Sequence, residues 1–344
     1  MKLLSSVFCG VLLLTLTLSS CKKHNDTTIE APKVGLVSGV GGFSDAGFNQ
    51  SVYTGFIRAT KDLPLHCEAR ESFSTADISS NITYFVNNGF SLIITVGYDA
   101  AQYTSDAAKA HPGIDFSILD YAFDTIRPNV ECVVFDVDQS SFPCGFLAAW
   151  WTNSHNPLTP KAGFVGGPDI PGIRQFSVSY TKGVEYFNTK YNKNVQTIGC
   201  YASSFGDTLE GARLADSLLK LNVTTIFAFA GQTGNGALYK VKEAGRWAIG
   251  VDVDQYNSIP AVGSVLLTSC MKELGDVTYG ILADYTLGTF RGGNVIHGNL
   301  ANFGVGLAPF HEYELFIPDS INLAINTIKN GIIAGTIKTG WPEK

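Results

Sequence analysis

Short apolar runs alternate with amphipathic helical segments along most of this chain, and this alternation constrains the fold more than any other feature. The runs typical of buried strands are residues 34–39, 91–97, 114–120, 161–167, 224–231, 246–252 and 262–269. Between them apolar residues recur at helical spacing, as in Phe48, Val52 and Phe56, and again within residues 78–85 and 209–219. Such alternation is typical of α/β proteins whose parallel sheets are covered by helices on both faces.

The N-terminal residues have the layout of a secretory signal. Lys2 precedes an apolar run over residues 7–18, and small residues follow before Cys21. The run is shorter than the roughly 20 residues that a membrane-spanning helix needs. Residues 18–21 resemble a bacterial lipobox, although an ordinary signal with an incidental Cys is the alternative. The pattern predicts a signal peptide at 1–20, lipidation of Cys21 and a polar tether at 21–32, which would hold the protein on the extracytoplasmic side of a membrane.

Composition narrows the function classes. Removing residues 1–20 takes away Lys2 and no acidic residue, which leaves 324 residues with 23 basic and 30 acidic side chains and a net charge of about −7. Mild acidity without a basic cluster argues against nucleic acid as a partner. Five of the seven Cys follow Cys21 and form no CxxC pair, and the six His are scattered. We therefore predict no metal and no cofactor. The length suggests about two domains.

The tetrapeptide Asp-Val-Asp-Gln occurs twice, at 136–139 and 252–255, each time after an apolar run. On a strand, the two Asp of each copy would share a face and offer two carboxylates to a metal. No third ligand accompanies either pair. The alternative interpretation, that the chain leaves a sheet at both places, needs no metal.

A glycine-rich turn, GVGGFSDAGFNQ at 39–50, follows the first predicted strand. It begins as a dinucleotide fingerprint would, but Ser44 stands where the third glycine should be, and no Walker pattern is present. Phosphate binding is therefore weakly supported. Asp45 is a candidate helix cap or ligand contact. Phe48 is either core or a platform for a flat ligand, and Asn49 would offer that ligand both a donor and an acceptor.

Similar residues follow strands in the second half. Phe205 lies in a turn otherwise made of Ser, Gly and Asp, and Gly231 opens a glycine-rich turn suited to close backbone approach. Asp252 ends one apolar run and Lys272 follows another. Because ligands of open α/β sheets bind beyond the carboxyl ends of strands, these residues are candidates for one site.

Several of these segments together resemble the basic membrane protein family, the purine-nucleoside receptor A-like lipoproteins that bind substrate for ABC importers. The resemblance covers about residues 33–310, in order: KVGLVSGVGGFSDAGFNQSVYTGF (33–56), GFVGGPDIPGIRQF (163–176), AGQTGNG (230–236), IGVDVDQ (249–255), VLLTSCMK (265–272) and FGVGLA (303–308). It implies a type I periplasmic-binding-protein fold, with two Rossmann-like lobes joined by a three-strand hinge. We expect an N-terminal lobe of residues 33–136 plus 252–300 and a C-terminal lobe of residues 137–251 plus 301–344.

The resemblance also implies roles for the candidate residues and for partners. A nucleoside, purine by preference, would bind between the lobes, and an ABC permease with its ATPase would receive it without catalysis by this chain. The resemblance implies that Phe48 and Phe205 sandwich the base and that Asn49 and Asp120 contact the base or ribose. It also implies that Gly231 approaches the ligand through its backbone and that Asp252 and Lys272 bind the ribose hydroxyls. We count Asp45 with these ligand-binding candidates.

Gly39 departs from the family pattern, in which many members carry an Asp that helps to recognise the base. We expect the absence of this Asp to relax or change the base preference. Tyr98 and Asp99 are candidates to take over its role in recognising the base. Pyrimidine nucleosides, modified purines or another flat ring with a polyol tail, such as a flavin, stay open as ligands. Two competing functions are a sensor lipoprotein and a nucleoside-processing enzyme that would use carboxylates near Asp136 or Asp252.

Overall fold

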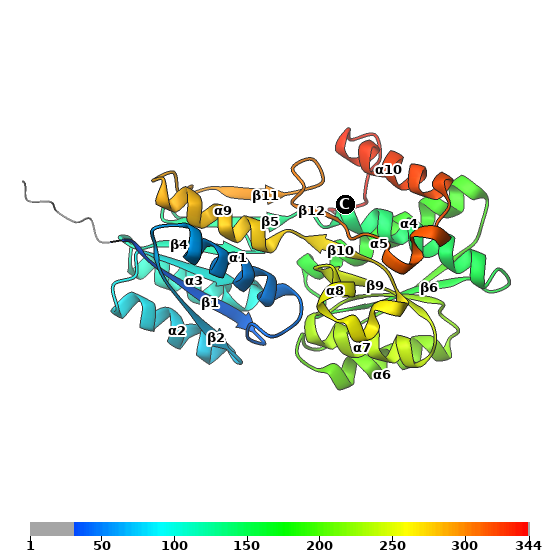
Figure 1. Ribbon diagram of the computed structural model, residues 1–344, viewed down its shortest axis with the longest axis horizontal. Helices are drawn as coiled ribbons and strands as arrows, with labels where there is room; N and C mark the ends of the chain where they lie inside the picture. The colour runs from blue at the N-terminus through cyan, green and yellow to red at the C-terminus, as the bar shows by residue number, and fades with distance from the viewer. Residues whose placement is uncertain (1–30, 343–344) are drawn as a thin grey trace, which may run out of the picture. The chain divides into compact units, whose positions relative to one another are not determined.

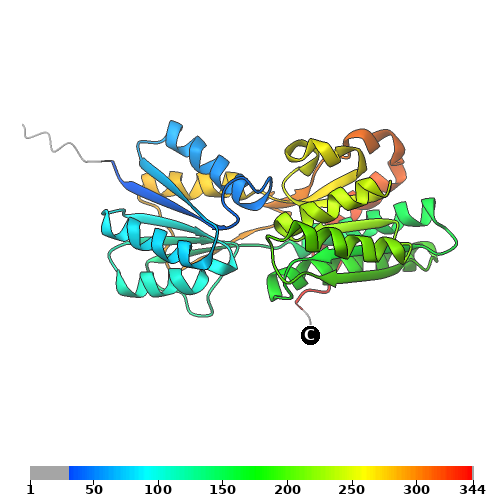
Figure 2. The same ribbon diagram turned by 90° about the horizontal axis from the view of Figure 1, so that it is seen from below.

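The computed structural model describes residues 31–342. The predicted signal peptide, Cys21 and most of the predicted tether lie outside the described residues. Within residues 31–342 the chain forms two six-stranded sheets with helices on both faces, as Figures 1 and 2 show. The predicted α/β class with two sheets of mostly parallel strands is confirmed.

The first sheet is parallel throughout. Its strands lie in the spatial order β11 (Val295–Gly298), β5 (Val130–Phe135), β4 (Asp115–Leu119), β3 (Leu92–Val96), β1 (Lys33–Val40) and β2 (His66–Ser72). Val34 of β1 stands opposite Cys67 of β2 and Leu92 of β3. Because the strands run the same way, their carboxyl ends meet at one edge of the sheet.

The second sheet repeats this order. Its strands are β12 (Val305–Leu307), β10 (Leu266–Lys272), β9 (Trp247–Asp252), β8 (Thr225–Phe229), β6 (Lys161–Gly166) and β7 (Gln196–Tyr201). β12 is antiparallel to β10, and the other pairs are parallel. Each strand of one sheet therefore has a counterpart at the same position in the other, so that β4 corresponds to β9 and β2 to β7.

Helices cover both faces of each sheet because each presents an apolar stripe. Around the first sheet lie α1 (Phe48–Asp62) and α9 (Leu274–Thr286) on one face, and η1 (Tyr98–Ala100), α2 (Thr75–Asn87) and α3 (Ala101–Ala110) on the other. The second sheet is covered by α4 (Asp138–His155), α5 (Pro171–Tyr191) and α10 (Asp319–Ile333) on one face, and by α6 (Thr208–Lys220) and α7 (Gly231–Glu243) on the other. The remaining short helices are α8 (Gln255–Ser258), η2 (Pro260–Val265) and η3 (His311–Phe316).

The predicted helical stripes form core contacts with one exception. Val52 and Phe56 of α1 are fully buried against β1, β3 and β4, as their spacing predicts. Leu209, expected on the buried face of α6, is instead 82% exposed, and the helix buries Gly211, Ala215 and Leu218. Leu209 lies in the first turn of α6 and belongs to no core cluster of the described residues.

The chain passes between the two sheets three times within the described residues, in agreement with the expected three-strand hinge. It crosses after β5, after β10 and between β11 and β12. One expected boundary differs: residues 252–300 do not all accompany the first sheet. Strand β10 pairs in parallel with β9, so the second crossing comes after Lys272 and not at Asp252.

Two further local expectations need correction. The predicted strand at 262–269 begins only at Leu266, because Pro260 starts a 3₁₀ helix that runs to Val265. The Asp pairs of the repeated tetrapeptide do not share a strand face. Strand β5 ends before Asp136 and β9 ends at Asp252, so both copies lie where the chain leaves a sheet.

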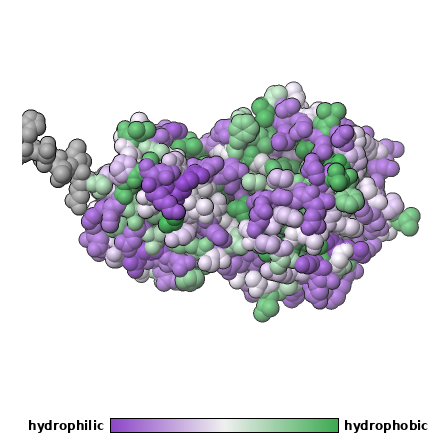
Figure 3. Space-filling model, viewed as in Figure 1, coloured by the Kyte–Doolittle hydropathy of each residue, from purple (hydrophilic) through white to green (hydrophobic). Residues whose placement is uncertain are grey.

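No helix among residues 31–342 is long and apolar enough to cross a membrane. On the face shown in Figure 3, hydrophobic residues are interspersed with hydrophilic ones. The long apolar side chains of the strands lie in the cores between sheets and helices.

Candidate functional site

A cavity of about 490 Å³ lies between the carboxyl edges of the two sheets. Its size falls within the roughly 300–1,000 Å³ typical of small-molecule sites. All eight residues that the sequence singled out for ligand binding line it: Asp45, Phe48, Asn49, Asp120, Phe205, Gly231, Asp252 and Lys272. They come from both sheets because the strand ends of one sheet face those of the other. We call this space the inter-sheet cavity.

A buried lysine joins two carboxylates at the bottom of this site. Lys272 Nζ lies 2.7 Å from Asp120 Oδ2 and 3.7 Å from Asp252 Oδ1, and only 6% of the Lys272 side chain is exposed. Burial lowers the pKa of Lys272, but the charges of Asp120 and Asp252 outweigh burial and raise it overall. The lysine is therefore charged at neutral pH. Its remaining N–H is available to a ligand.

Asp252 titrates near neutrality. Burial raises its pKa to about 6, because the charged form loses hydration; Lys272 lowers the pKa, while Asp120 and Asp45 raise it. A carboxylate of this kind accepts hydrogen bonds in its ionised form and gains a proton in mildly acidic solution. Perturbed titration in a cleft is a common property of ligand-binding groups.

Asp120 and Asp252 occupy corresponding places in the two sheets. Asp120 directly follows β4, and Asp252 is the last residue of the corresponding strand β9. Both adopt a left-handed backbone conformation, with φ of 62° at Asp120 and 65° at Asp252. Non-glycine residues in this conformation are uncommon and cost free energy, and such strain concentrates at functional sites. The backbone turns both carboxylates towards the same lysine. This correspondence is separate from the repeated tetrapeptide.

Two aromatic rings of the cavity wall lie against glycines. A Cβ on Gly97 would lie 3.4 Å from the Phe48 ring, and a Cβ on Gly167 would lie 2.3 Å from the Phe205 ring. Because these glycines have no side chain, each ring can lie close to the backbone at the end of a neighbouring strand in its own sheet. Phe48 also packs partly against the core, as the core interpretation predicts, and its role as a platform for a flat ligand stays a prediction. Lys272 Nζ is 5.2 Å from the centre of the Phe48 ring, within the range of a cation–π contact.

Asp45 acts as the cap of helix α1. Its Oδ1 accepts from the backbone N–H groups of Gly47 and Gln50, and its Oδ2 accepts from the backbone and side-chain nitrogens of Asn49. These four bonds use the ordinary acceptor capacity of a carboxylate. Asp45 therefore shapes the cavity mainly by holding Asn49 in place.

Asn49 has less to offer a ligand than its residue type suggests. Its Oδ1 accepts from the backbone N–H of Gly39 at 2.8 Å, and its Nδ2 donates to Asp45 at 3.1 Å. These neighbours fix the amide orientation, since a backbone N–H only donates and a carboxylate only accepts. One N–H of Nδ2 and one lone pair of Oδ1 remain, so the expectation that Asn49 presents both a donor and an acceptor stays a prediction.

Charges in the cavity wall are mostly negative. Five aspartates and a single lysine line it: Asp45, Asp99, Asp120, Asp124, Asp252 and Lys272. A phosphate group would meet these carboxylates at short range, and like charges in a partly buried site repel strongly. The wall instead suits a neutral ligand that donates hydrogen bonds. Burial also raises the pKa of Asp99, which lies beside Tyr98 on the same wall.

Side chains from the second half of the site hold the glycine-rich turn. Gln232 Nε2 donates to Gly41 O at 3.4 Å, Asn235 Nδ2 to Asp45 O at 3.0 Å, and Ser258 Oγ to Ala46 O at 2.7 Å. Gln232 and Asn235 lie in the first two turns of α7. The sequence did not single out these residues, because their partners lie about 190 or more positions away. These bonds join the edges of the two sheets beside the cavity.

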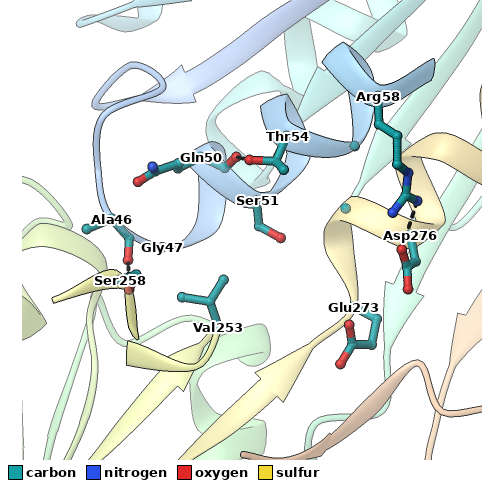
Figure 4. Close-up of a pocket in the computed structure, with 12 residues that line it drawn as sticks. Ala46, Gly47, Gln50, Ser51, Thr54, Arg58, Val253, Ser258, Glu273 and Asp276 are labelled. Carbon is teal, nitrogen blue, oxygen red and sulfur yellow. Dashed lines mark hydrogen bonds and ion pairs between the residues drawn. The ribbon is translucent and has the colours of Figure 1, made fainter. Parts of the chain in front are cut away.

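A second cavity of about 330 Å³ opens beside α1 and the start of α9, as Figure 4 shows. Arg58 pairs with Asp276 at 2.8 Å there, and both side chains are largely exposed. Burial, with the charge of Asp276, raises the pKa of Glu273. No aromatic ring lines this hollow. Among residues 31–342 no group of three or more potential ligands could hold a metal. The inter-sheet cavity is therefore the candidate ligand site.

Comparisons with known proteins show which family this chain resembles. The family model described as "ABC transporter substrate-binding protein PnrA-like" matches residues 32–338. Basic membrane protein B of Borreliella burgdorferi is 30% identical over 86% of this chain and 87% of its own. The ABC transporter nucleoside-binding protein BmpA of Lactococcus lactis is 29% identical over 84% and 86%.

A solved structure has the same fold. The solute-binding protein of an ABC transporter system from Aeropyrum pernix K1 superposes with a TM-score of 0.82, over 89% of this chain and 92% of its own. The two sequences are 24% identical, so this likeness concerns the fold alone. It matches the expected α/β architecture with two sheets.

Proposed function

This chain belongs to the family of PnrA-like ABC transporter substrate-binding proteins, and we propose that it captures a nucleoside in the inter-sheet cavity for delivery to an ABC permease and its ATPase. The family binds solutes, so the chain is a binding protein and not an enzyme. The observation that carries the proposal is the combination of an aromatic ring from each half of the site with the buried Asp120–Lys272–Asp252 group.

The buried ion group suits a ribose. Vicinal hydroxyls can donate to the Asp120 and Asp252 carboxylates, and an ionised acceptor makes these bonds stronger than neutral ones. Lys272 can donate its third N–H to a hydroxyl oxygen or ring oxygen. The negative wall disfavours a phosphate at the same place, which favours a nucleoside over a nucleotide.

The aromatic rings suit a nucleobase. Phe48 comes from the first turn of α1 and Phe205 from the turn after β7, so the two rings approach the cavity from different sheets. Stacking on a base contributes about 1–3 kcal/mol per ring. A ligand that touches both sheets also stabilises their closed arrangement, since it binds that arrangement better than an open one.

The anchor part of the proposal rests on the N-terminal sequence pattern. A lipid on Cys21 would tether the protein to the cell envelope outside the cytoplasm, near the permease that it serves. A relative named as a nucleoside-binding ABC transporter protein supports the same transport role. We propose a preference for purines as part of this function, although Gly39 stands where many family members carry an Asp that helps to recognise the base.

Calorimetric titration tests the proposed function directly. The purified protein, unfolded and refolded to remove carried ligand, is titrated with purine and pyrimidine nucleosides, free bases, ribose and nucleoside monophosphates. We expect nucleosides to bind without turnover and more tightly than free bases, ribose or monophosphates. Failure of every nucleoside to bind would reject the nucleoside proposal and direct the search to other flat rings with polyol tails.

Asp252 gives the binding a predictable pH dependence. Its pKa is raised to about 6, so the ionised acceptor predominates above that pH and is lost below it. If Asp252 accepts from ribose hydroxyls, affinity for nucleosides should fall by up to about tenfold per pH unit below pH 6. Asp252→Asn should remove this slope and weaken nucleosides more than free bases.

The matched control is Asp284→Asn, which alters a carboxylate paired with Arg291 away from the cavity. Asp45, Asp120 and Lys272 face Asp252 and are left unchanged in both variants. Equal losses for nucleosides and free bases, or a pH slope that persists in Asp252→Asn, would remove Asp252 from the ribose site.

A further inference from the structure

The wall of the inter-sheet cavity at Gly39 is built without a side chain. The Gly39 N–H is bonded to Asn49 Oδ1, and a Cβ at this position would lie 3.0 Å from that oxygen and 3.1 Å from Val96 O. Such contacts are tighter than most Cβ atoms make, so a side chain here would displace Asn49 or β3. Any acceptor for the edge of a base must therefore come from another element.

Gln232 supplies a side chain at the same patch of wall from the other sheet. A Cβ on Gly41 would lie 3.7 Å from Gln232 Nε2 and 3.9 Å from Asn49 Nδ2. Both amide groups therefore border Gly41, although their residues are far apart in sequence. Gln232 is half-buried and lines the cavity.

The orientation of the Gln232 amide follows from its partner. Gly41 O is a backbone carbonyl and can only accept, so the amide nitrogen faces it. Oε1 then occupies the other arm of the amide, and no hydrogen bond to Oε1 occurs among the residues that the structure describes. Asn49 keeps one N–H, as shown above. A donor from Asn49 and an acceptor from Gln232 thus remain for a ligand in the cavity that both residues line.

We propose that Gln232 is a specificity-determining residue that reads the edge of the bound base, with Oε1 accepting an N–H of the base while Asn49 donates to a neighbouring base acceptor. This assignment rests on the proposed nucleoside function. The ligand class is a nucleoside whose base carries an N–H donor next to an acceptor, as adenine does at N6 and N7. Gln232 belongs to α7 and donates a hydrogen bond to Gly41 in the turn after β1. The same side chain would therefore take part in base recognition and in closure of the two halves.

Three purine nucleosides test this assignment. Adenosine carries an exocyclic amino group, inosine carries a ring N–H, and purine riboside carries no N–H on its base. Gln232→Met keeps the side-chain length and removes both hydrogen-bonding groups. Loss of the bond to Gly41 should weaken all three nucleosides by a common factor. Beyond that factor, we expect adenosine and inosine to lose about tenfold more affinity than purine riboside, the effect of one hydrogen bond.

Asn235→Ala is the matched control, because Asn235 also bonds the glycine-rich turn from α7 but does not line the cavity. Asn235→Ala should lower the affinity for all three nucleosides by a similar factor, because it removes a bond that holds the two halves together and no group that lines the cavity. If Gln232→Met also weakens all three equally, the residue acts only by holding Gly41 and the assignment is wrong. If the wild-type protein binds none of the three but binds other nucleosides, the assignment alone fails. If it binds no nucleoside, the proposed function fails with it.

Discussion

Replacing Lys272 by Met should lower the free energy of unfolding by about 3–5 kcal/mol near pH 8, the usual cost of leaving buried charges without their partner. Lys272 is the positive charge between Asp120 and Asp252. Its removal leaves two carboxylates close together in a partly buried site, where their repulsion is weakly screened. Urea unfolding monitored by circular dichroism measures the change. Nucleoside binding should be lost in the same variant.

The loss should shrink in mildly acidic solution. Asp252 has a raised pKa, and removing the lysine removes an influence that lowers it. Protonation then neutralises one of the two carboxylates. Because the native state of the variant binds this proton more tightly than the unfolded state does, its stability relative to wild type should rise as pH falls towards 5.

Lys182→Met provides a matched control. Lys182 Nζ lies 2.7 Å from Glu185 Oε2, the same separation as Lys272 from Asp120, but 47% of the Lys182 side chain is exposed. Exposed pairs contribute about 0–1 kcal/mol. Similar losses in the two variants would show that the buried ion group is not a stability element.

Phe205→Ala should weaken nucleoside binding by about 1–3 kcal/mol, which is roughly 5- to 150-fold in the dissociation constant. The ring lies against Gly167 in the cavity wall and belongs to no core cluster of the described residues. Removing it should therefore cost binding and little folding stability. Calorimetry with a nucleoside, together with urea unfolding, separates the two effects.

Phe73 is the counterpart of Phe205 in the other half of the fold. It lies in the turn after β2, the edge strand that corresponds to β7, and it is 67% exposed and does not line the inter-sheet cavity. Phe73→Ala should leave nucleoside affinity unchanged. If Phe205→Ala also leaves affinity unchanged, stacking on Phe205 has no part in binding.

Central strands and the site residues next to them could be predicted from sequence because their signals are local. β1, β3 and β8 are buried along their length and read as continuous apolar runs. Edge strands β2 and β7 carry exposed or half-buried polar residues and gave no comparable run. Strand ends in parallel sheets converge on one edge, so Phe48, Asp252 and Lys272 could be expected together before any coordinates were known.

The sequence by itself determined the α/β class, the family and the set of residues at the strand ends, because these depend on hydrophobic periodicity and on short motifs. Tertiary structure decided how those residues are used. Asp45 became a helix cap, Asn49 Oδ1 came to accept from the backbone N–H of Gly39, and Gln232 came to border Gly41. These outcomes depend on hydrogen bonds and close contacts whose geometry, in the last case across two sheets, no local pattern encodes.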